Sequence, residues 1–349
     1  MGSLNSAAEV TEALRAHGYV TDDRLATVMY LATALNKPVL VEGPAGVGKT
    51  ELAKSLAAAT GRRLIRLQCY EGQDDTKALY EWDYGKQLLY TQLLREKIDS
   101  LLEDLPDLGG AAERLSRHES VFFSEHFLVS RPLLEAIRSD EPAVLLIDEI
   151  DRADEHLEAL MLEVLAEFQV TIPELGTVAA KFVPYVVITS NNTRELSEAL
   201  KRRCVHLSLG YPGAARELEI LRLKVPGIAD ELRRQVVDVV RGIRELDLRK
   251  SPSISEAIDW ARALALLNVA SLGRQVVEET LMLILKYDRD VETAARALPR
   301  LFGEPEDEGL DRDHGHDHDH RHSHGNGHSH DGPEERYRRH ALGYFGAVS

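Results

Sequence analysis

Two separate segments of this chain carry residue types that can do chemistry together. Residues 43–50 read Gly-Pro-Ala-Gly-Val-Gly-Lys-Thr, and residues 143–149 form an apolar run that ends in Asp148 and Glu149. The first segment matches the phosphate-binding pattern G-x-x-x-x-G-K-[ST] in full. The second is typical of a strand buried on both faces, and α/β sheets bind ligands at the carboxyl ends of such strands. Together the segments predict a site for a nucleoside triphosphate and Mg²⁺.

The side chains of these segments have different expected tasks. Glycine lets backbone N–H groups turn toward phosphate oxygens, and the N-terminus of a following helix adds partial positive charge. Lys49 is expected to pair with the β- and γ-phosphates, while Thr50 and Asp148 hold Mg²⁺. Glu149 is expected to polarise the attacking water. The predicted nucleotide-binding residues are Gly43, Pro44, Ala45, Gly46, Val47, Gly48, Lys49, Thr50 and Asp148.

The composition narrows the class of protein. A chain of 349 residues, of which 44% are hydrophobic and 29% charged, can bury more than one core, so we expect two domains. The formal net charge of −16 argues against a general nucleic-acid binder, because a phosphate backbone demands a basic surface. No apolar run approaches the length of a membrane span, and Cys69 and Cys204 show no motif spacing. We therefore expect a cytoplasmic location and no membrane span.

Strand and helix patterns alternate around the two segments. Five short apolar stretches predict a doubly wound parallel sheet, with strands at 38–41, 63–67, 143–147, 185–188 and 204–209. Helical periods lie between or before them, at 5–16, 23–36, 49–59, 87–102, 132–137 and 153–168, and a further helix is expected to end near Leu200. Residues 70–86 look irregular, whereas residues 169–182 alternate around a turn and predict a hairpin.

Strand signals vanish after residue 212, and helical periods dominate to residue 301. The expected organisation is therefore an α/β nucleotide-binding domain over residues 1–212 and an all-helical domain over 213–302. Residues 303–349 are acidic and histidine-rich, and we expect a disordered tail in which 337–345 can dock as a short helix.

The tail has the composition of a metal-binding segment. Eight of the fourteen histidines fall between residues 311 and 331, mostly at every second position, and imidazole favours Cu²⁺, Ni²⁺ and Zn²⁺. A solvating linker and adventitious binding are the alternatives. The predicted ligands are His314, His316, His318, His320, His322, His324, His328 and His330.

The motifs between residues 43 and 203, taken in their order along the chain, make it resemble AAA+ ATPases of the MoxR type. Within that family, it resembles the branch associated with maturation of molybdenum-containing carbon monoxide dehydrogenase. The resemblance covers roughly residues 20–300 and rests on five segments, which are the phosphate loop 43–50, the acidic strand 145–152, the hairpin insert 169–181, the polar strand end 189–192 and the basic segment 201–203.

The resemblance implies both a fold and a function. The fold is an AAA+ P-loop core with a five-stranded parallel sheet, a hairpin insert and a C-terminal all-helical lid. The activity is Mg²⁺-dependent hydrolysis of ATP to ADP and phosphate in a homo-oligomeric ring, expected to be a hexamer. The implied role is that of a remodelling chaperone. It acts with a von Willebrand factor A-domain (VWA-domain) partner on a client metalloenzyme, such as the molybdenum hydroxylase CO dehydrogenase, during maturation or cofactor insertion.

Further site residues follow from the resemblance. The fourth strand should end in an amide that reads the γ-phosphate, for which Asn191 is the first choice and Asn192 the second. An arginine from a neighbouring subunit should reach the transferred phosphoryl group, and Arg203 is preferred to Arg202. Two plainer interpretations stay open, namely asparagines of a turn and basic residues at a solvated helix end.

One departure from the family concerns the helical lid, which usually presents an arginine to the γ-phosphate. The matching residues around Ser253 contain none. Arg249 and Lys250 lie just before them, and Arg274 is expected at the end of the following helix, so the role is either displaced or absent. Ser253 with Glu256 three residues later predicts a capping box instead.

Two other function classes compete with an ATP-driven remodelling enzyme. One is a metal store or metallochaperone that acts through the histidine-rich tail. The other is a nucleic-acid-related ring NTPase, against which the acidic charge counts. The guanine-reading pattern Asn-Lys-x-Asp of small GTPases is also missing, since Asn36-Lys37 is followed by Pro38-Val39.

Overall fold

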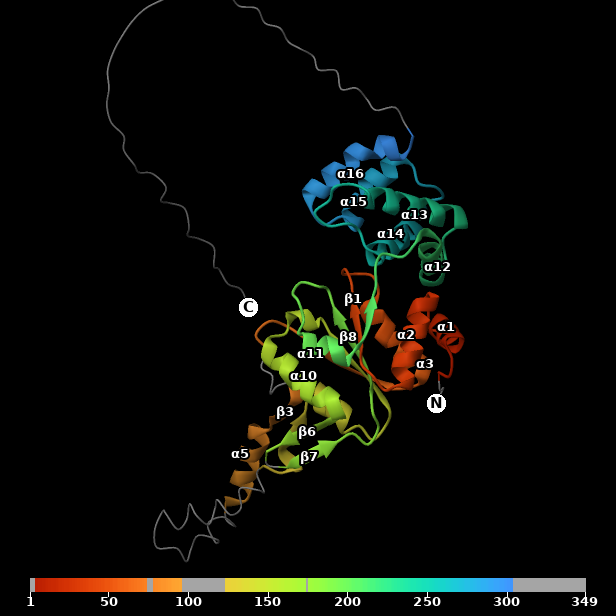
Figure 1. Ribbon diagram of the computed structural model, residues 1–349. Coiled ribbons are helices and arrows are strands. Elements are labelled where there is room, and N and C mark those ends of the chain that lie inside the picture. The colour runs from red at the N-terminus through yellow and green to blue at the C-terminus, as the bar shows by residue number, and fades with distance from the viewer. Residues whose placement is uncertain (1–3, 74–77, 96–122, 174, 304–349) are drawn as a thin grey trace, which may run out of the picture. The chain divides into compact units, whose positions relative to one another are not determined.

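A computed structural model describes residues 4–73, 78–95, 123–173 and 175–303, all within one compact unit formed by residues 1–305. Its main sheet has five strands, and neighbours pair in parallel in the order β2-β5-β8-β1-β9. The predicted parallel sheet is confirmed, and the parallel register places the carboxyl ends of β1, β5 and β8 at one edge. Figure 1 shows β1 and β8, which pair with each other. The strands are β1 (Val39–Glu42), β2 (Arg63–Gln68), β5 (Ala143–Asp148), β8 (Tyr185–Ser190) and β9 (Val205–Ser208).

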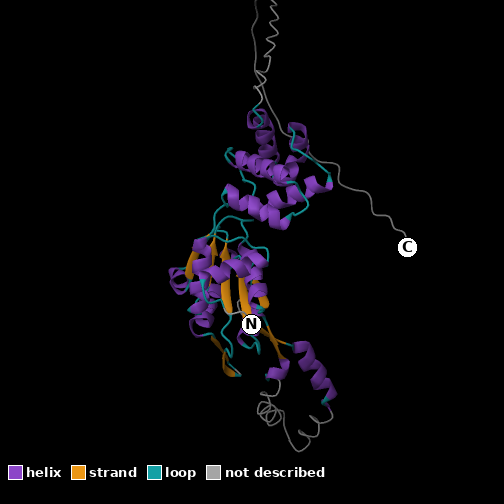
Figure 2. Cartoon of the chain, turned by 90° about the vertical axis from the view of Figure 1, so that its right-hand side faces the viewer, coloured by secondary structure: helices purple, strands orange, loops and turns teal. Residues whose placement is uncertain are grey.

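Helices cover both faces of this sheet, as Figure 2 shows, because its central strands are apolar on both sides. Val144 and Leu146 of β5 pack in a cluster with residues of the first three helices, whereas Leu145 and Ile147 pack in a second cluster on the other face. Every residue of β5 is buried. The flanking helices are α1 (Ala7–Ala16), α2 (Asp23–Ala34), α3 (Lys49–Thr60), α9 (Pro132–Ile137), α10 (Glu155–Glu167) and α11 (Glu198–Arg203).

Two small antiparallel pairs lie outside the main sheet. The predicted hairpin is confirmed as β6 (Gln169–Ile172) and β7 (Gly176–Ala179). β3 (Tyr80–Trp82) pairs with β4 (Leu128–Ser130), so the last part of the segment predicted to be irregular is in fact a strand. The strand forms because the Trp82 ring is buried, a tertiary contact that local polarity does not reveal.

The helices next to these pairs differ in their limits from the predicted ones. α5 (Tyr84–Leu93) begins before residue 87 because Asp83 caps it, accepting from the backbone N–H of Lys86 at 2.8 Å. The end predicted at residue 102 lies outside the described residues. η1 (Glu125–Phe127) is a short 3₁₀ turn that leads into β4.

The helix predicted to end near Leu200 is shifted toward the C-terminus. Residues 193–197 are not helical, and α11 runs from Glu198 to Arg203. The physical reason is that Asp151 accepts from the backbone and side chain of Thr193, which holds this segment in a non-helical course. Ser197 then caps α11 by accepting from the backbone N–H of Leu200.

The chain ends, within its described part, in five helices with a hydrophobic cluster of their own. Trp260 is fully buried at its centre, and its indole N–H donates to Thr280 Oγ1 at 2.9 Å. Arg274 begins a helix, so the expectation that it ends one was wrong. The helices are α12 (Ala214–Lys224), α13 (Asp230–Arg244), α14 (Ile254–Leu266), α15 (Arg274–Ile284) and α16 (Asp288–Leu301).

The fold class is therefore confirmed as a five-stranded parallel sheet with flanking helices and a helical C-terminal region. The domain boundaries near 212 and 302 stay predictions. The predicted histidine ligands and the terminal helix at 337–345 lie outside the described residues. Among the helices that the structure describes, none combines the length and the apolar character needed to cross a membrane.

Candidate nucleotide site

The phosphate loop joins the carboxyl end of β1 to α3, and its glycines adopt backbone geometry that other residues rarely reach. Gly46 and Gly48 have φ angles of 76° and 96°. A Cβ at Gly43 would collide with the backbone of Leu209, and one at Gly46 with the side chain of Ser253. No side chain caps the start of α3, so its first N–H groups can serve a ligand. A loop of this kind fits a phosphate group.

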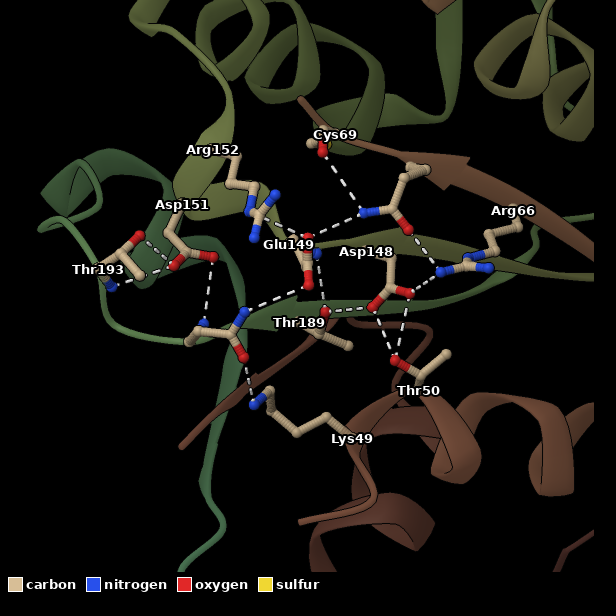
Figure 3. A network of polar contacts seen from close by, with 12 residues as sticks. Lys49, Thr50, Arg66, Cys69, Asp148, Glu149, Asp151, Arg152, Thr189 and Thr193 are labelled. Atoms are coloured by element: carbon tan, nitrogen blue, oxygen red, sulfur yellow. Dashed lines mark hydrogen bonds and ion pairs between the residues drawn. The ribbon is translucent and has the colours of Figure 1, made fainter. Parts of the chain in front are cut away.

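Lys49 is buried, and its ammonium is fixed by three oxygens. It donates to the carbonyl oxygens of Gly43 and Pro44, each at 2.7 Å. It also donates to Asn191 Oδ1 at 2.8 Å, the bond drawn from Lys49 in Figure 3. Burial lowers the pKa of Lys49, and nearby carboxylates oppose that shift; they are Asp151, Asp148 and Glu149. The lysine therefore lies where the loop, β8 and the acidic strand meet.

Asp148 ends β5 and is almost fully enclosed, with 2% of its surface exposed. Thr50 Oγ1 donates to it, 2.9 Å from Oδ1 and 3.2 Å from Oδ2, and Thr189 Oγ1 donates to Oδ1 at 2.6 Å. Arg66 of β2 donates from Nη2 to Oδ2 at 2.5 Å. The oxygen ligands of Thr50 and Asp148 thus lie within reach of one small ion, and this donor set fits Mg²⁺.

Glu149 follows Asp148 with a left-handed backbone, at φ 58°, which turns its side chain toward β8. Its backbone N–H donates to Thr189 Oγ1 at 2.9 Å. Its carboxylate accepts from Asn191 Nδ2 at 3.4 Å and from Gln68 Nε2 at 3.1 Å, and it pairs with Arg152 at 3.1 Å. A non-glycine residue in this conformation is uncommon, so the local contacts must hold it there.

Asp151 is a buried carboxylate that organises the end of β8. It accepts from the backbone N–H of Asn191 at 3.1 Å, and from the N–H and Oγ1 of Thr193 at 3.0 and 2.6 Å. Burial alone would raise the pKa of Asp151, but the hydrogen bonds from Thr193 and Asn191 outweigh it and lower the pKa below its ordinary value. The orientation of Asn191 therefore depends on a negative charge at Asp151.

The structure brings Asn191 into contact with both Lys49 and Glu149. Asn192 has a left-handed backbone, at φ 59°, and its N–H donates to Ser190 Oγ at 3.0 Å, which fits the turn interpretation. The two asparagines thus differ in their contacts, and the role of Asn191 as the amide that reads the γ-phosphate stays a prediction.

The two candidate arginines lie at the end of α11. Arg202 has 81% of its side chain exposed and pairs with Glu198 at 3.4 Å. Arg203 is also exposed, and it lines a surface hollow of about 440 Å³ together with Glu163 and Glu167 of α10. Both therefore face outward from the described part of the chain.

A cavity of about 670 Å³ adjoins the phosphate loop, and neither Asp148 nor Glu149 lines it. Val47, Gly48 and Tyr19 border this cavity. Burial raises the pKa of the Tyr19 hydroxyl. Helices of the C-terminal region complete its wall. Their lining residues are Arg216, Ile220, Lys224, Ile254, Ser255, Ile258, Asp259 and Arg262. Its place and size suit the base and sugar of a nucleotide.

The helical region meets the phosphate loop through two serines. Ser255 Oγ donates to the Gly46 carbonyl at 3.1 Å, and Ser253 lies against the same glycine. The predicted capping box of Ser253 and Glu256 is confirmed. Arg249, one of the candidates for the missing arginine, lies over the Tyr287 ring with its guanidinium 4.1 Å from the ring centroid.

Sequence reasoning missed several residues of the site. Arg66 and Gln68 alternate along β2, and polar residues on a strand beside the acidic one were an available signal. Thr189 belongs to the polar strand end that was recognised, but its contact with Asp148 was not expected. Asp151 lies within the acidic segment 145–152, but the sequence pattern predicts no role for it.

The candidate site lies within a segment that matches a known protein family. The family model described as "ATPase family associated with various cellular activities (AAA)" matches residues 39–210. An uncharacterized protein of Staphylococcus haemolyticus is 25% identical over 76% of this chain and 90% of its own length. Gas vesicle ATPase GvpN of Ancylobacter aquaticus is 26% identical over 66% of this chain and 61% of its own length.

Solved structures include RuvB, a Holliday junction branch migration motor of Thermotoga maritima. It is 17% identical, with a TM-score of 0.41 over 80% of this chain and 71% of that one. No functional conclusion is drawn from a structural similarity of that size. The assignment to a family rests on the match to the family model, whose matched residues include the phosphate loop and the pair Asp148 and Glu149. Residues 39–210 of this chain are an AAA-type ATPase domain.

Proposed function

We propose that the chain is a MoxR-type remodelling ATPase that hydrolyses ATP in a hexameric homo-oligomeric ring. The observation that supports this best is the line of contacts from Lys49 through Asn191 to Glu149, beside the pair of Thr50 and Asp148. These contacts bring together groups that bind phosphate, hold a metal and act on water.

The proposed chemistry follows from that arrangement. Mg²⁺, when bound by Thr50 and Asp148, would neutralise charge on the β- and γ-phosphates. Lys49 binds the same phosphates. Glu149 orients the attacking water, and the Asn191 amide donates to Glu149 at one end while it accepts from Lys49 at the other. One neutral side chain thus links the position of the phosphate to the position of the water.

In the proposed ring, Arg203 acts on the nucleotide of the neighbouring subunit, with Arg202 as the second choice. Their exposed positions at the end of α11 suit residues that work across an interface. An arginine supplied in this way can raise the rate of phosphoryl transfer by roughly 10³- to 10⁵-fold.

The proposed task is maturation of a metalloenzyme, or insertion of its cofactor, together with a VWA-domain partner. The support is the order of motifs that resembles the carbon monoxide dehydrogenase branch. The client is a molybdenum hydroxylase. Isolation of the chain from its native cells, with Glu149→Gln to slow release, should recover such a client and a VWA-domain protein.

The histidine-rich tail supports a second proposal, that of metal delivery or storage. Deletion of residues 311–331 should abolish high-capacity binding of Cu²⁺, Ni²⁺ and Zn²⁺ and leave ATP hydrolysis largely intact, because the ATPase domain lies elsewhere in the chain. Equilibrium dialysis of both chains measures the loss. If the shortened chain binds these metals as well as the full chain does, the histidines are not the metal-binding site.

The ATPase mechanism is tested by Glu149→Gln. The amide keeps the size of the side chain but cannot polarise water, so we expect ATP binding to persist and turnover to fall by about 10²-fold or more. Glu141→Gln, at an exposed position just before β5, is the matched control and should turn over normally. Normal turnover by the Glu149 variant would exclude this residue from the mechanism.

A further inference from the structure

β2 places a positive charge against the proposed metal site. Strand register pairs Gln68 with Asp148, and Arg66 lies two residues earlier on the same face of β2. The Arg66 guanidinium reaches Asp148 Oδ2 at 2.5 Å, and Gln68 Oε1 accepts from it at 2.5 Å. The guanidinium is therefore held by two acceptors on neighbouring strands.

The two ends of this ion pair differ in exposure. The Asp148 side chain is 3% exposed and the Arg66 side chain 46% exposed. Asp148 also accepts from Thr50 and Thr189, so all of its contacts are fixed by the fold. Arg66 is the partner with room to move, because almost half of its side chain faces solvent.

We propose that Arg66 is a positioning residue that weakens binding of a divalent metal alone and so makes that binding depend on nucleotide. This inference rests on the proposed metal site of Thr50 and Asp148. Arg66 and a divalent ion would share one carboxylate, and two cations on one carboxylate repel each other. The phosphates of a nucleotide bring further negative charge, which offsets the guanidinium.

The proposal predicts a difference between metal alone and metal with nucleotide. Removing the charge at position 66 should strengthen binding of the metal alone more than binding of the metal with ADP. A merely structural role for Arg66 would predict weaker binding in both conditions, because Asp148 would lose a hydrogen bond that orients it.

The experiment is a titration of the full chain with Mn²⁺, followed by electron paramagnetic resonance, with and without ADP. Arg66→Gln retains hydrogen-bonding groups and loses the charge. We expect Mn²⁺ alone to bind about five- to twentyfold tighter, and Mn²⁺ with ADP to change by less than about threefold. Arg66→Lys, which keeps the charge, should stay near the original affinity.

Two controls separate the possible failures. Arg63→Gln removes a charge from the same strand at an exposed pair with Glu135, and it should change neither titration. Asp148→Asn should abolish the Mn²⁺ signal of this site. If it does not, the proposed metal site is wrong. If it does, but Arg66→Gln leaves binding of Mn²⁺ alone unchanged or weaker, the role of Arg66 is wrong and the site stands.

Discussion

The phosphate loop is contacted from two sides, and the two sides differ in their chemistry. On the sheet side, hydrogen bonds connect Lys49, Asp148 and Glu149 through side chains of β2 and β8. On the helical side, Ser253 and Ser255, which are neutral, lie against Gly46. The charged groups around Lys49 therefore lie at the strand ends, whereas Gly46 of the loop meets hydroxyl groups; the charged side chains of the helical region, such as Arg216 and Lys224, line the neighbouring cavity instead.

The difference follows from how each side is built. β5 is buried along its whole length and β8 after Tyr185, so their carboxyl ends can hold charged groups at fixed separations. Ser253 lies at the start of α14, where its side chain and Glu256 complete the capping box. Arg249 lies over Tyr287, within the helical region. We infer that the sheet side performs the chemistry and that the helical side shapes the loop.

The largest effect should come from the sheet side, with Lys49→Ala. Loss of this ammonium leaves the phosphates without their main cation, so nucleotide affinity should fall by about 10²-fold or more and hydrolysis should stop. Nucleotide binding by calorimetry measures the first and phosphate release the second.

The same variant sharpens the proposal for Arg203. An Arg203→Ala chain keeps Lys49, so in mixed rings an intact pair of Lys49 and Arg203 can form at some interfaces. Partial recovery of hydrolysis on mixing supports action between subunits. No recovery at any ratio would remove that support.

The sequence predicted the sheet side well because its signals are local. The phosphate loop is a contiguous motif, and the five strands are apolar stretches bounded by turns, so residues 43–50 and the Asp148 and Glu149 pair could be placed directly. β3 escaped prediction because its burial depends on a tertiary contact of Trp82. The shift of α11 escaped for a related reason, since Thr193 is held by Asp151, a residue distant in the chain.

The contacts between the sheet and the helical region could be predicted only in part. The capping box is local and was predicted, but the position of Ser255 against Gly46 depends on how two regions pack. Arg66 was predicted only as a residue of the strand at 63–67, and Gln68 fell just outside that strand, because their partners come from the neighbouring segment and pairing register is not visible in one sequence.

A smaller effect is expected from Asp151→Asn. The pKa of Asp151 lies below its ordinary value of 3.8 in the folded chain, so the ionised carboxylate stabilises the fold at pH values above that value. This stabilisation is lost as the pH falls through the lower, folded pKa. The variant should lose about 1–3 kcal/mol of unfolding free energy at pH 7, because an amide replaces an acceptor of three hydrogen bonds.

Urea unfolding at pH 7 and near pH 3 measures both parts of this prediction. The difference between the original chain and the Asp151 variant should be largest at neutral pH and should shrink in acid. A difference that grows as the pH falls would mean that Asp151 is protonated at neutral pH and acts as a donor.

The smallest effect should come from the helical side, with Ser255→Ala. The lost hydrogen bond to the Gly46 carbonyl has a net value of about 0.5–1.5 kcal/mol, so ADP release should become about two- to tenfold faster as the loop loosens. Stopped-flow release of a fluorescent ADP measures the rate, with the exposed Ser271→Ala as the matched control. Arg249→Ala should leave the rate unchanged, because Arg249 stacks on Tyr287. If Arg249→Ala has the larger effect, the helical side acts through charge after all, and the contrast between the two sides of the loop fails.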